Sequence, residues 1–126
     1  MENNFLTDDF NLLIKTAKEK IANIENLKKS QIIIVMSGKN NLFYEIIDYT
    51  LTDAYLKGNK LINELKENED TEVRKILCMW NDGCIELPSI YFRKLLCELN
   101  EKNKYSEILL NGKDSLFVSK INRIMI

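Results

Sequence analysis

Two apolar runs within residues 73–87 are separated by a three-residue turn sequence, Asn81 to Gly83. Aspartate and glycine both tolerate positive φ, so the last two residues of this sequence favour a two-residue hairpin loop. In that register Trp80 lies opposite Ile85, and their side chains share one face with the other apolar residues at alternate positions. Because the turn chemistry and the alternation agree, a hairpin over 73–87 is the strongest local constraint on the fold.

Apolar spacing along the rest of the chain predicts further elements around this hairpin. The β-branched run from Ile32 to Met36 is typical of a buried strand, and residues 105–110 indicate another strand. Helical spacing predicts helices over 8–28, 41–67, 89–100 and from about 115 to the end. The sequence therefore predicts a single α+β domain over 1–126, with a small mixed or antiparallel sheet packed against about four helices.

The composition excludes several kinds of chemistry. The 126 residues contain no histidine, which is the commonest general acid/base and the commonest metal ligand. The three cysteines show no Cys-x-x-Cys spacing, so neither a zinc site nor any other metal or cofactor site is expected. With 18 basic and 19 acidic residues, nucleic-acid binding is not expected either. We therefore expect no catalytic residues and a protein that is not an enzyme.

Residues 41–72 carry the strongest local charge bias, with eight acidic residues against three basic ones. If 41–67 is a helix, the face opposite its apolar stripe interleaves tyrosines with carboxylates, a combination that suits recognition of a basic protein surface. The predicted contact residues on this face are Tyr44, Glu45, Asp48 and Tyr55. The polar loop that follows offers a second candidate surface, made of Glu67, Glu69 and Asp70.

The stretch from Trp80 to Asn100, WNDGCIELPSIYFRKLLCELN, resembles small immunity proteins of bacterial contact-dependent inhibition and related polymorphic toxin systems. The resemblance covers about a sixth of the chain and supplies no binding positions. It implies a protein that binds a cognate toxin, in such systems often a basic nuclease, and blocks its active site without catalysis. Carboxylates that stand in for substrate phosphates would steer such an association, so the expected partner is a toxin with a basic surface.

Two other functions remain open from the residues alone. The region from Arg93 to Lys113 is modestly basic, as in a small phage or plasmid regulator that binds nucleic acid. A small enzyme with a cysteine or carboxylate site is the third possibility, and Cys84 next to the turn is the thiol most expected to be exposed.

The sequence also indicates a compartment. Residues 1–5 lack the basic and apolar regions of a secretory signal. The longest apolar run, Ile32 to Met36, is far shorter than the ~20 residues of a membrane span. Three cysteines within apolar stretches are typical of reduced thiols. We therefore expect a cytoplasmic protein with no membrane contact.

Overall fold

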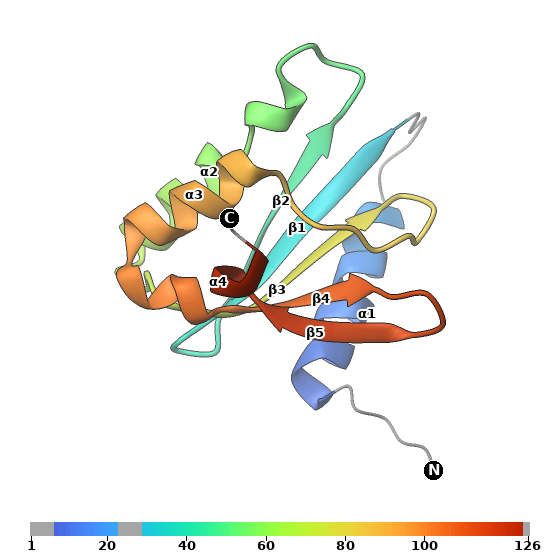
Figure 1. Ribbon diagram of the computed structural model, residues 1–126. Coiled ribbons are helices and arrows are strands. Elements are labelled where there is room, and N and C mark those ends of the chain that lie inside the picture. Colours follow the sequence, from blue (N-terminus) through green and yellow to red (C-terminus); the bar gives the residue numbers. More distant parts are fainter. Residues whose placement is uncertain (1–6, 23–28, 125–126) are drawn as a thin grey trace.

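The computed structural model describes residues 7–22 and 29–124, apart from the side chain of Tyr55. Figure 1 shows the elements in chain order: α1 (Asp8–Ala22), β1 (Ser30–Ser37), β2 (Leu42–Asp48), the 3-10 helix η1 (Ala54–Leu56), α2 (Asn59–Glu67), β3 (Val73–Trp80), α3 (Ile90–Leu99), the 3-10 helix η2 (Glu101–Tyr105), β4 (Glu107–Asn111), β5 (Leu116–Lys120) and α4 (Ile121–Ile124). The predicted α+β class is confirmed. None of the helices in these two ranges is long and apolar enough to cross a membrane.

The five strands form one mixed sheet in the order β2-β1-β3-β4-β5. β1 pairs antiparallel with both β2 and β3, β4 runs parallel to β3, and β5 returns antiparallel to β4. All eight residues of β1 are buried, because this strand lies inside the sheet and helices cover both of its faces.

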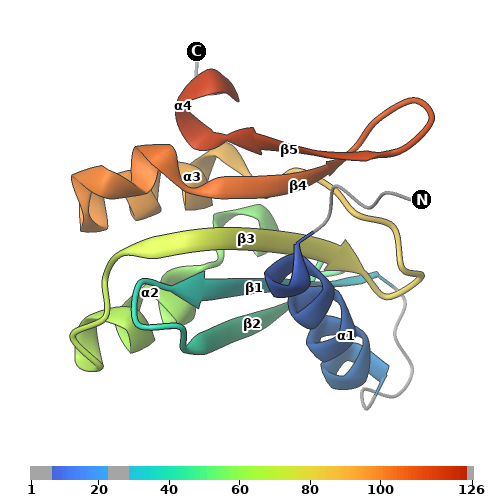
Figure 2. The same cartoon turned by 90° about the horizontal axis from the view of Figure 1, so that it is seen from below.

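Helices cover the two faces of the sheet as separate layers (Figure 2). α1 packs on one face through Phe10, Leu13, Ala17 and Ile21, against the even-numbered side chains of β1. α2 and α3 pack on the other face through Leu61, Leu65, Phe92 and Leu96, against the odd-numbered side chains. The alternation of the strand and the helical stripes therefore builds two apolar cores, one on each side of the sheet.

The helix predicted over 41–67 is wrong in its first part. Residues 42–48 form the edge strand β2, a loop and η1 follow, and only Asn59–Glu67 is α-helical. Phe43 and Ile47 are four residues apart, which fits a helix, but with Glu45 between them they also fit one face of a strand. Pairing with the buried strand β1 decides between the two, and the sequence pattern does not contain that long-range contact.

The predicted turn after β3 is present, but the residues that follow it form one isolated bridge and no strand, and the register differs by one residue from the prediction. Trp80 N–H donates to the carbonyl of Cys84 at 2.8 Å, and Met79, in place of Trp80, bridges Ile85. Because Trp80 pairs with Cys84, the loop has three residues, 81–83, and the last of them, Gly83, takes φ 94°. The shift turns Ile85 to the α1 face, together with Met79.

The predicted helix at the C-terminal end is also only partly correct, because residues 116–120 form β5 and helical structure is confined to Ile121–Ile124. The helix predicted over 89–100 is confirmed as α3, and that over 8–28 is confirmed for 8–22. The rest of the helix predicted over 8–28, residues 23–28, lies outside the described residues.

Candidate functional site

α2 begins with two unusual features. Its N-cap residue is Gly58 with φ 125°, a conformation that a side chain disfavours. The cap itself lacks a side chain, and the buried carboxylate of Glu45 on β2 accepts a hydrogen bond from Leu61 N–H at 3.0 Å. An anion at this position satisfies one of the open amide groups of the first turn and suits the helix dipole. The start of α2 is therefore anchored to the edge strand.

α3 is preceded by the chain's one proline, Pro88, and by its N-cap residue, Ser89. The Ser89 hydroxyl accepts a hydrogen bond from Phe92 N–H at 3.2 Å. Arg93 is buried and donates to the carbonyl of Pro88 at 3.0 Å and to that of Ile124 at 3.3 Å. Burial lowers the pKa of its guanidinium. These contacts fix the direction of α3 and tie α4 to its first turn.

The first turns of α2 and α3 meet at what we call the helix-start junction, made of Gly58, Asn59, Ser89, Tyr91 and Phe92. A Cβ atom at position 58 would lie only 2.5 Å from Cδ1 of Phe92, so the ring packs directly on the glycine backbone. Beside this contact, the Asn59 amide donates to the Tyr91 hydroxyl at 3.2 Å. The junction is closed by an aromatic ring and a polar pair.

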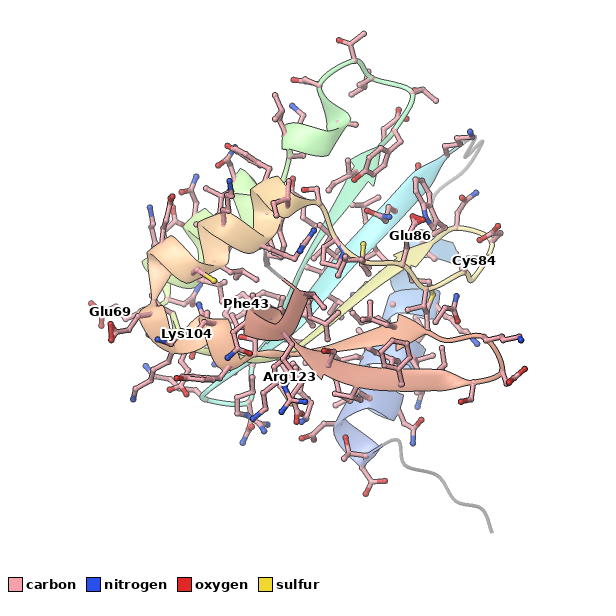
Figure 3. All side chains as sticks on the ribbon, in the orientation of Figure 1. Phe43, Glu69, Cys84, Glu86, Lys104 and Arg123 are labelled. Carbon is pink, nitrogen blue, oxygen red and sulfur yellow. The ribbon has the colours of Figure 1, made fainter. Side chains whose placement is uncertain are left out.

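A second feature, which we call the Trp80 hollow, lies where β3 ends. It has a volume of about 470 Å³ and is lined by Lys29, Trp80, Asn81, Asp82, Cys84 and Glu86. The Trp80 indole N–H donates to a Glu86 carboxylate oxygen at 2.5 Å, and the Tyr49 ring packs against the indole with a centroid distance of 4.9 Å. Figure 3 shows Glu86 and Cys84 on the segment that follows β3.

The charges in the hollow are mostly negative. Asp82 accepts a hydrogen bond from the backbone N–H of Cys84 at 2.9 Å, which lowers the pKa of this carboxyl group. The same carboxylate raises the pKa of the Cys84 thiol, first through a hydrogen bond and then through its charge. Cys84 is therefore held as a neutral thiol, which opposes the nucleophilic role considered for it.

Two further residues with polar groups, Tyr49 and Gln31, lie next to Trp80. Burial raises the pKa of Tyr49 to about 12, and the charges of Cys78 and Glu86 act in the same direction. Gln31 pairs with Trp80 across β1 and β3, is 2 % exposed, and its side-chain oxygen has no hydrogen-bond partner among the described residues. An unsatisfied buried acceptor beside the indole is unfavourable by about 1–3 kcal/mol unless a ligand or water reaches it.

The structure separates the residues that were predicted to form one binding face. Tyr44 lies exposed on β2, and the next residue, Glu45, is buried under α2. Asp48 ends the strand and accepts hydrogen bonds from the backbone and hydroxyl of Thr50. Tyr55 belongs to η1, and its side chain lies outside the described part of the structure. The helical face on which these four residues were combined therefore does not exist.

The second predicted surface lies at the other end of the molecule from the Trp80 hollow, as the labels of Glu69 and Glu86 show in Figure 3. Glu67 and Glu69 are exposed, but Asp70 is buried and accepts hydrogen bonds from the Ser37 hydroxyl at 2.5 Å and the Asn41 amide at 2.9 Å. Asp70 thus fixes the turn between β1 and β2. A role of any of these seven residues in binding stays a prediction.

The fold is shared with solved structures of enzymes. Cytidine deaminase from Mycobacterium leprae superposes with a TM-score of 0.68 over 92 % of this chain and 96 % of its own, at 15 % sequence identity. Cytidine deaminases from Mycobacterium tuberculosis (TM-score 0.65, 92 % and 93 %, 13 % identity) and Burkholderia pseudomallei (0.64, 91 % and 94 %, 14 %) agree. At such identities the likeness shows the fold alone. No family model matches the sequence, and no curated protein matches it.

These comparisons contradict the functional predictions. The chain shares its fold with cytidine deaminases, so the predicted immunity protein, the toxin partner and the alternative nucleic-acid regulator are wrong. The expectation that the chain is not an enzyme is contradicted by the same finding. The resemblance over 80–100 covers the end of β3, the turn and α3, so it reflects a strand-turn-helix arrangement and not a binding site.

Whether this chain could bind zinc depends on the residues at the helix-start junction. Zinc-dependent nucleobase deaminases carry the signatures His-x-Glu and Pro-Cys-x-x-Cys, which supply three metal ligands and a glutamate acid/base. In this chain the stretch from Pro88 to Phe92 has the spacing of the second signature, with serine and phenylalanine at the two cysteine positions. Across the junction, Gly58 and Lys60 have the spacing of histidine and glutamate.

These residues do not fit a zinc ion. Glycine and phenylalanine offer no donor atom, and a serine hydroxyl is not among the usual protein ligands of zinc. Within residues 7–22 and 29–124 no group of three or more His, Cys, Asp or Glu side chains could hold a metal ion. Neither the Trp80 hollow nor the helix-start junction was among the predicted sites. Two signals for them are present in the sequence: the one tryptophan beside the turn, and the spacing that follows Pro88.

Proposed function

We propose that this chain binds a nucleoside or a free nucleobase in the Trp80 hollow. The observation that carries the proposal is a hollow of about 470 Å³, lined in part by the Trp80 side chain, on a fold that cytidine deaminases share. The volume lies in the usual range of small-molecule sites, about 300–1,000 Å³. A planar base would stack on the Trp80 indole, which Tyr49 supports from the core side.

The polar groups of the hollow suit the edge of a base. Glu86 and Asp82 are acceptors for amino and ring N–H groups, and Lys29 is a donor for a ring carbonyl. The depressed pKa of Asp82 keeps this carboxyl group ionised and therefore purely an acceptor near neutral pH. Cytosine, which presents both an amino group and a carbonyl, would satisfy both kinds of group.

The charge of the hollow favours an unphosphorylated ligand. Two carboxylates, Asp82 and Glu86, face one ammonium group, that of Lys29. A phosphate would add negative charge next to the carboxylates and would be repelled, whereas a neutral base or nucleoside would not. The proposed substrate class is therefore nucleosides and bases, with nucleotides disfavoured. We also propose a cytoplasmic location, because the three thiols suit a reducing compartment.

The test uses the fact that the chain has one tryptophan, so its fluorescence reports on the hollow alone. Titration with cytidine should quench this fluorescence with a saturable curve, ribose should have no effect, and cytidine monophosphate should bind more weakly than cytidine. A linear response to cytidine without saturation, or equal responses to cytidine and ribose, would rule out the proposal.

Calorimetry of variants assigns the binding to the indole. Trp80→Leu should weaken cytidine binding about 5- to 140-fold, because stacking on an aromatic side chain contributes about 1–3 kcal/mol per base. Tyr105→Leu is the matched control, since Tyr105 is also an exposed aromatic residue but lies on η2. Equal affinities of the two variants would show that the base binds elsewhere.

A further inference from the structure

We infer that the helix-start junction is a metal-free replacement for a zinc site, in which the Phe92 ring fills the space between the two helix starts. The inference concerns a different place from the proposed ligand site and does not depend on nucleoside binding. Three observations carry it: the spacing of the residues, the contact between Gly58 and Phe92, and the polar pair beside it.

The spacing places non-ligands at all three ligand positions. Phe92 occupies the second cysteine position of the signature that starts at Pro88. Its ring packs on Gly58, which occupies the histidine position if Gly58 and Lys60 are aligned with His-x-Glu. The large side chain of Phe92 therefore occupies the space that the missing side chain of Gly58 leaves across the junction. Phe92 is 0 % exposed, so solvent does not reach its ring.

The contacts at the junction hold α2 and α3 together, as a structural metal does in other proteins. A bound metal would cross-link α2 and α3 through its ligands. Here the Phe92 ring joins the two helices by burial, and Asn59 and Tyr91 exchange hydrogen bonds of 3.2 and 3.4 Å next to it. The exposed Lys60 stands where the signature has its glutamate, so the acid/base group is also replaced.

The inference predicts that a zinc site can be introduced at the junction by substitution, because the backbone spacing for three ligands is still present. The triple variant Gly58→Cys/Ser89→Cys/Phe92→Cys should bind one zinc ion per chain, whereas the natural chain, incubated with zinc and dialysed, should retain none. Atomic spectroscopy measures the metal content, and Co²⁺ in place of zinc gives thiolate-to-metal absorption that reports cysteine ligation. The double variant Ser89→Cys/Phe92→Cys, which lacks the third ligand, is the matched control and should bind zinc at least tenfold more weakly.

Either of two results of the zinc-binding experiment would overturn the inference: stoichiometric zinc in the natural chain, or a folded triple variant that binds no more zinc than the double variant. Because loss of the Phe92 ring can itself unfold the protein, a second measurement uses the natural chain. Its thermal unfolding temperature should not change on addition of zinc or of a chelator. A chelator-induced fall in that temperature would show that a metal holds the junction and would overturn the inference as well.

Discussion

Replacing Gly58 with alanine tests the packing at the helix-start junction most sharply. Two separate costs follow from the structure. The φ of 125° at this position disfavours any side chain, by about 1–2 kcal/mol. The added methyl group would also lie 2.5 Å from the Phe92 ring, and overpacking of this kind costs about 1–3 kcal/mol. Gly58→Ala should therefore lower the free energy of unfolding by about 2–5 kcal/mol.

Gly83→Ala is the matched control, because it separates the two costs. Gly83 also has positive φ, 94°, but a Cβ atom there would meet no atom within 4 Å. Its replacement should cost only the backbone part, about 1–2 kcal/mol. Phe92→Leu in the Gly58→Ala background should relieve part of the steric cost, since a smaller side chain leaves room for the methyl group. The double-mutant cycle should therefore show a coupling of at least about 0.5 kcal/mol.

Urea denaturation followed by far-ultraviolet circular dichroism measures the free energies of unfolding of the natural chain, of the three single variants (Gly58→Ala, Gly83→Ala and Phe92→Leu) and of the double variant. This signal does not depend on the fluorescence of Trp80. Equal losses for Gly58→Ala and Gly83→Ala, with additive effects at 58 and 92, would refute the claim that the Phe92 ring packs tightly on the glycine.

Two further predictions concern pH. The pKa of Tyr49 is raised to about 12 in the folded protein. Its contribution to stability is therefore complete below its ordinary pKa near 10 and is lost as the pH rises from about 10 to 12. In unfolding experiments, the free energy of unfolding of Tyr49→Phe should fall less over this pH range than that of the natural chain. Burial alone would raise the pKa of Asp70, but hydrogen bonds from Ser37 and Asn41, together with Lys39, lower it overall. Its contribution is therefore present above the ordinary pKa of about 4 and is lost as the pH falls through the lower folded value, so Asp70→Asn should be less stable at neutral pH and less sensitive to acid than the natural chain.

The sequence predicted those elements whose signal is local. β1 follows from its run of β-branched residues, and α3 follows from its apolar spacing and the Ser89 cap, which the structure confirms. β2 and β5 were predicted as helix because both edge strands contain apolar residues at spacings that a helix also allows. Their strand conformation depends on pairing with β1 and β4, which are distant contacts.

The candidate site was less predictable for the same reason. The register of the turn after Trp80 depends on the positive φ of Gly83 in a three-residue loop, and a two-residue loop fits the same sequence. The contact between Gly58 and Phe92 joins two segments that are far apart in the chain, and neither residue type indicates chemistry. The absence of histidine led to the expectation that the chain is not an enzyme, which the fold shared with cytidine deaminases contradicts.

The most direct test of the proposed function is the nuclear magnetic resonance signal of the Trp80 indole N–H. The chain has one tryptophan, so this signal is unique and reports the group that donates to Glu86 in the hollow. We predict that cytidine shifts this signal in a saturable manner, together with the backbone amides of Asn81 to Glu86, while ribose leaves them unchanged. An unchanged indole signal at saturating cytidine, or shifts confined to residues outside the hollow, would contradict the account.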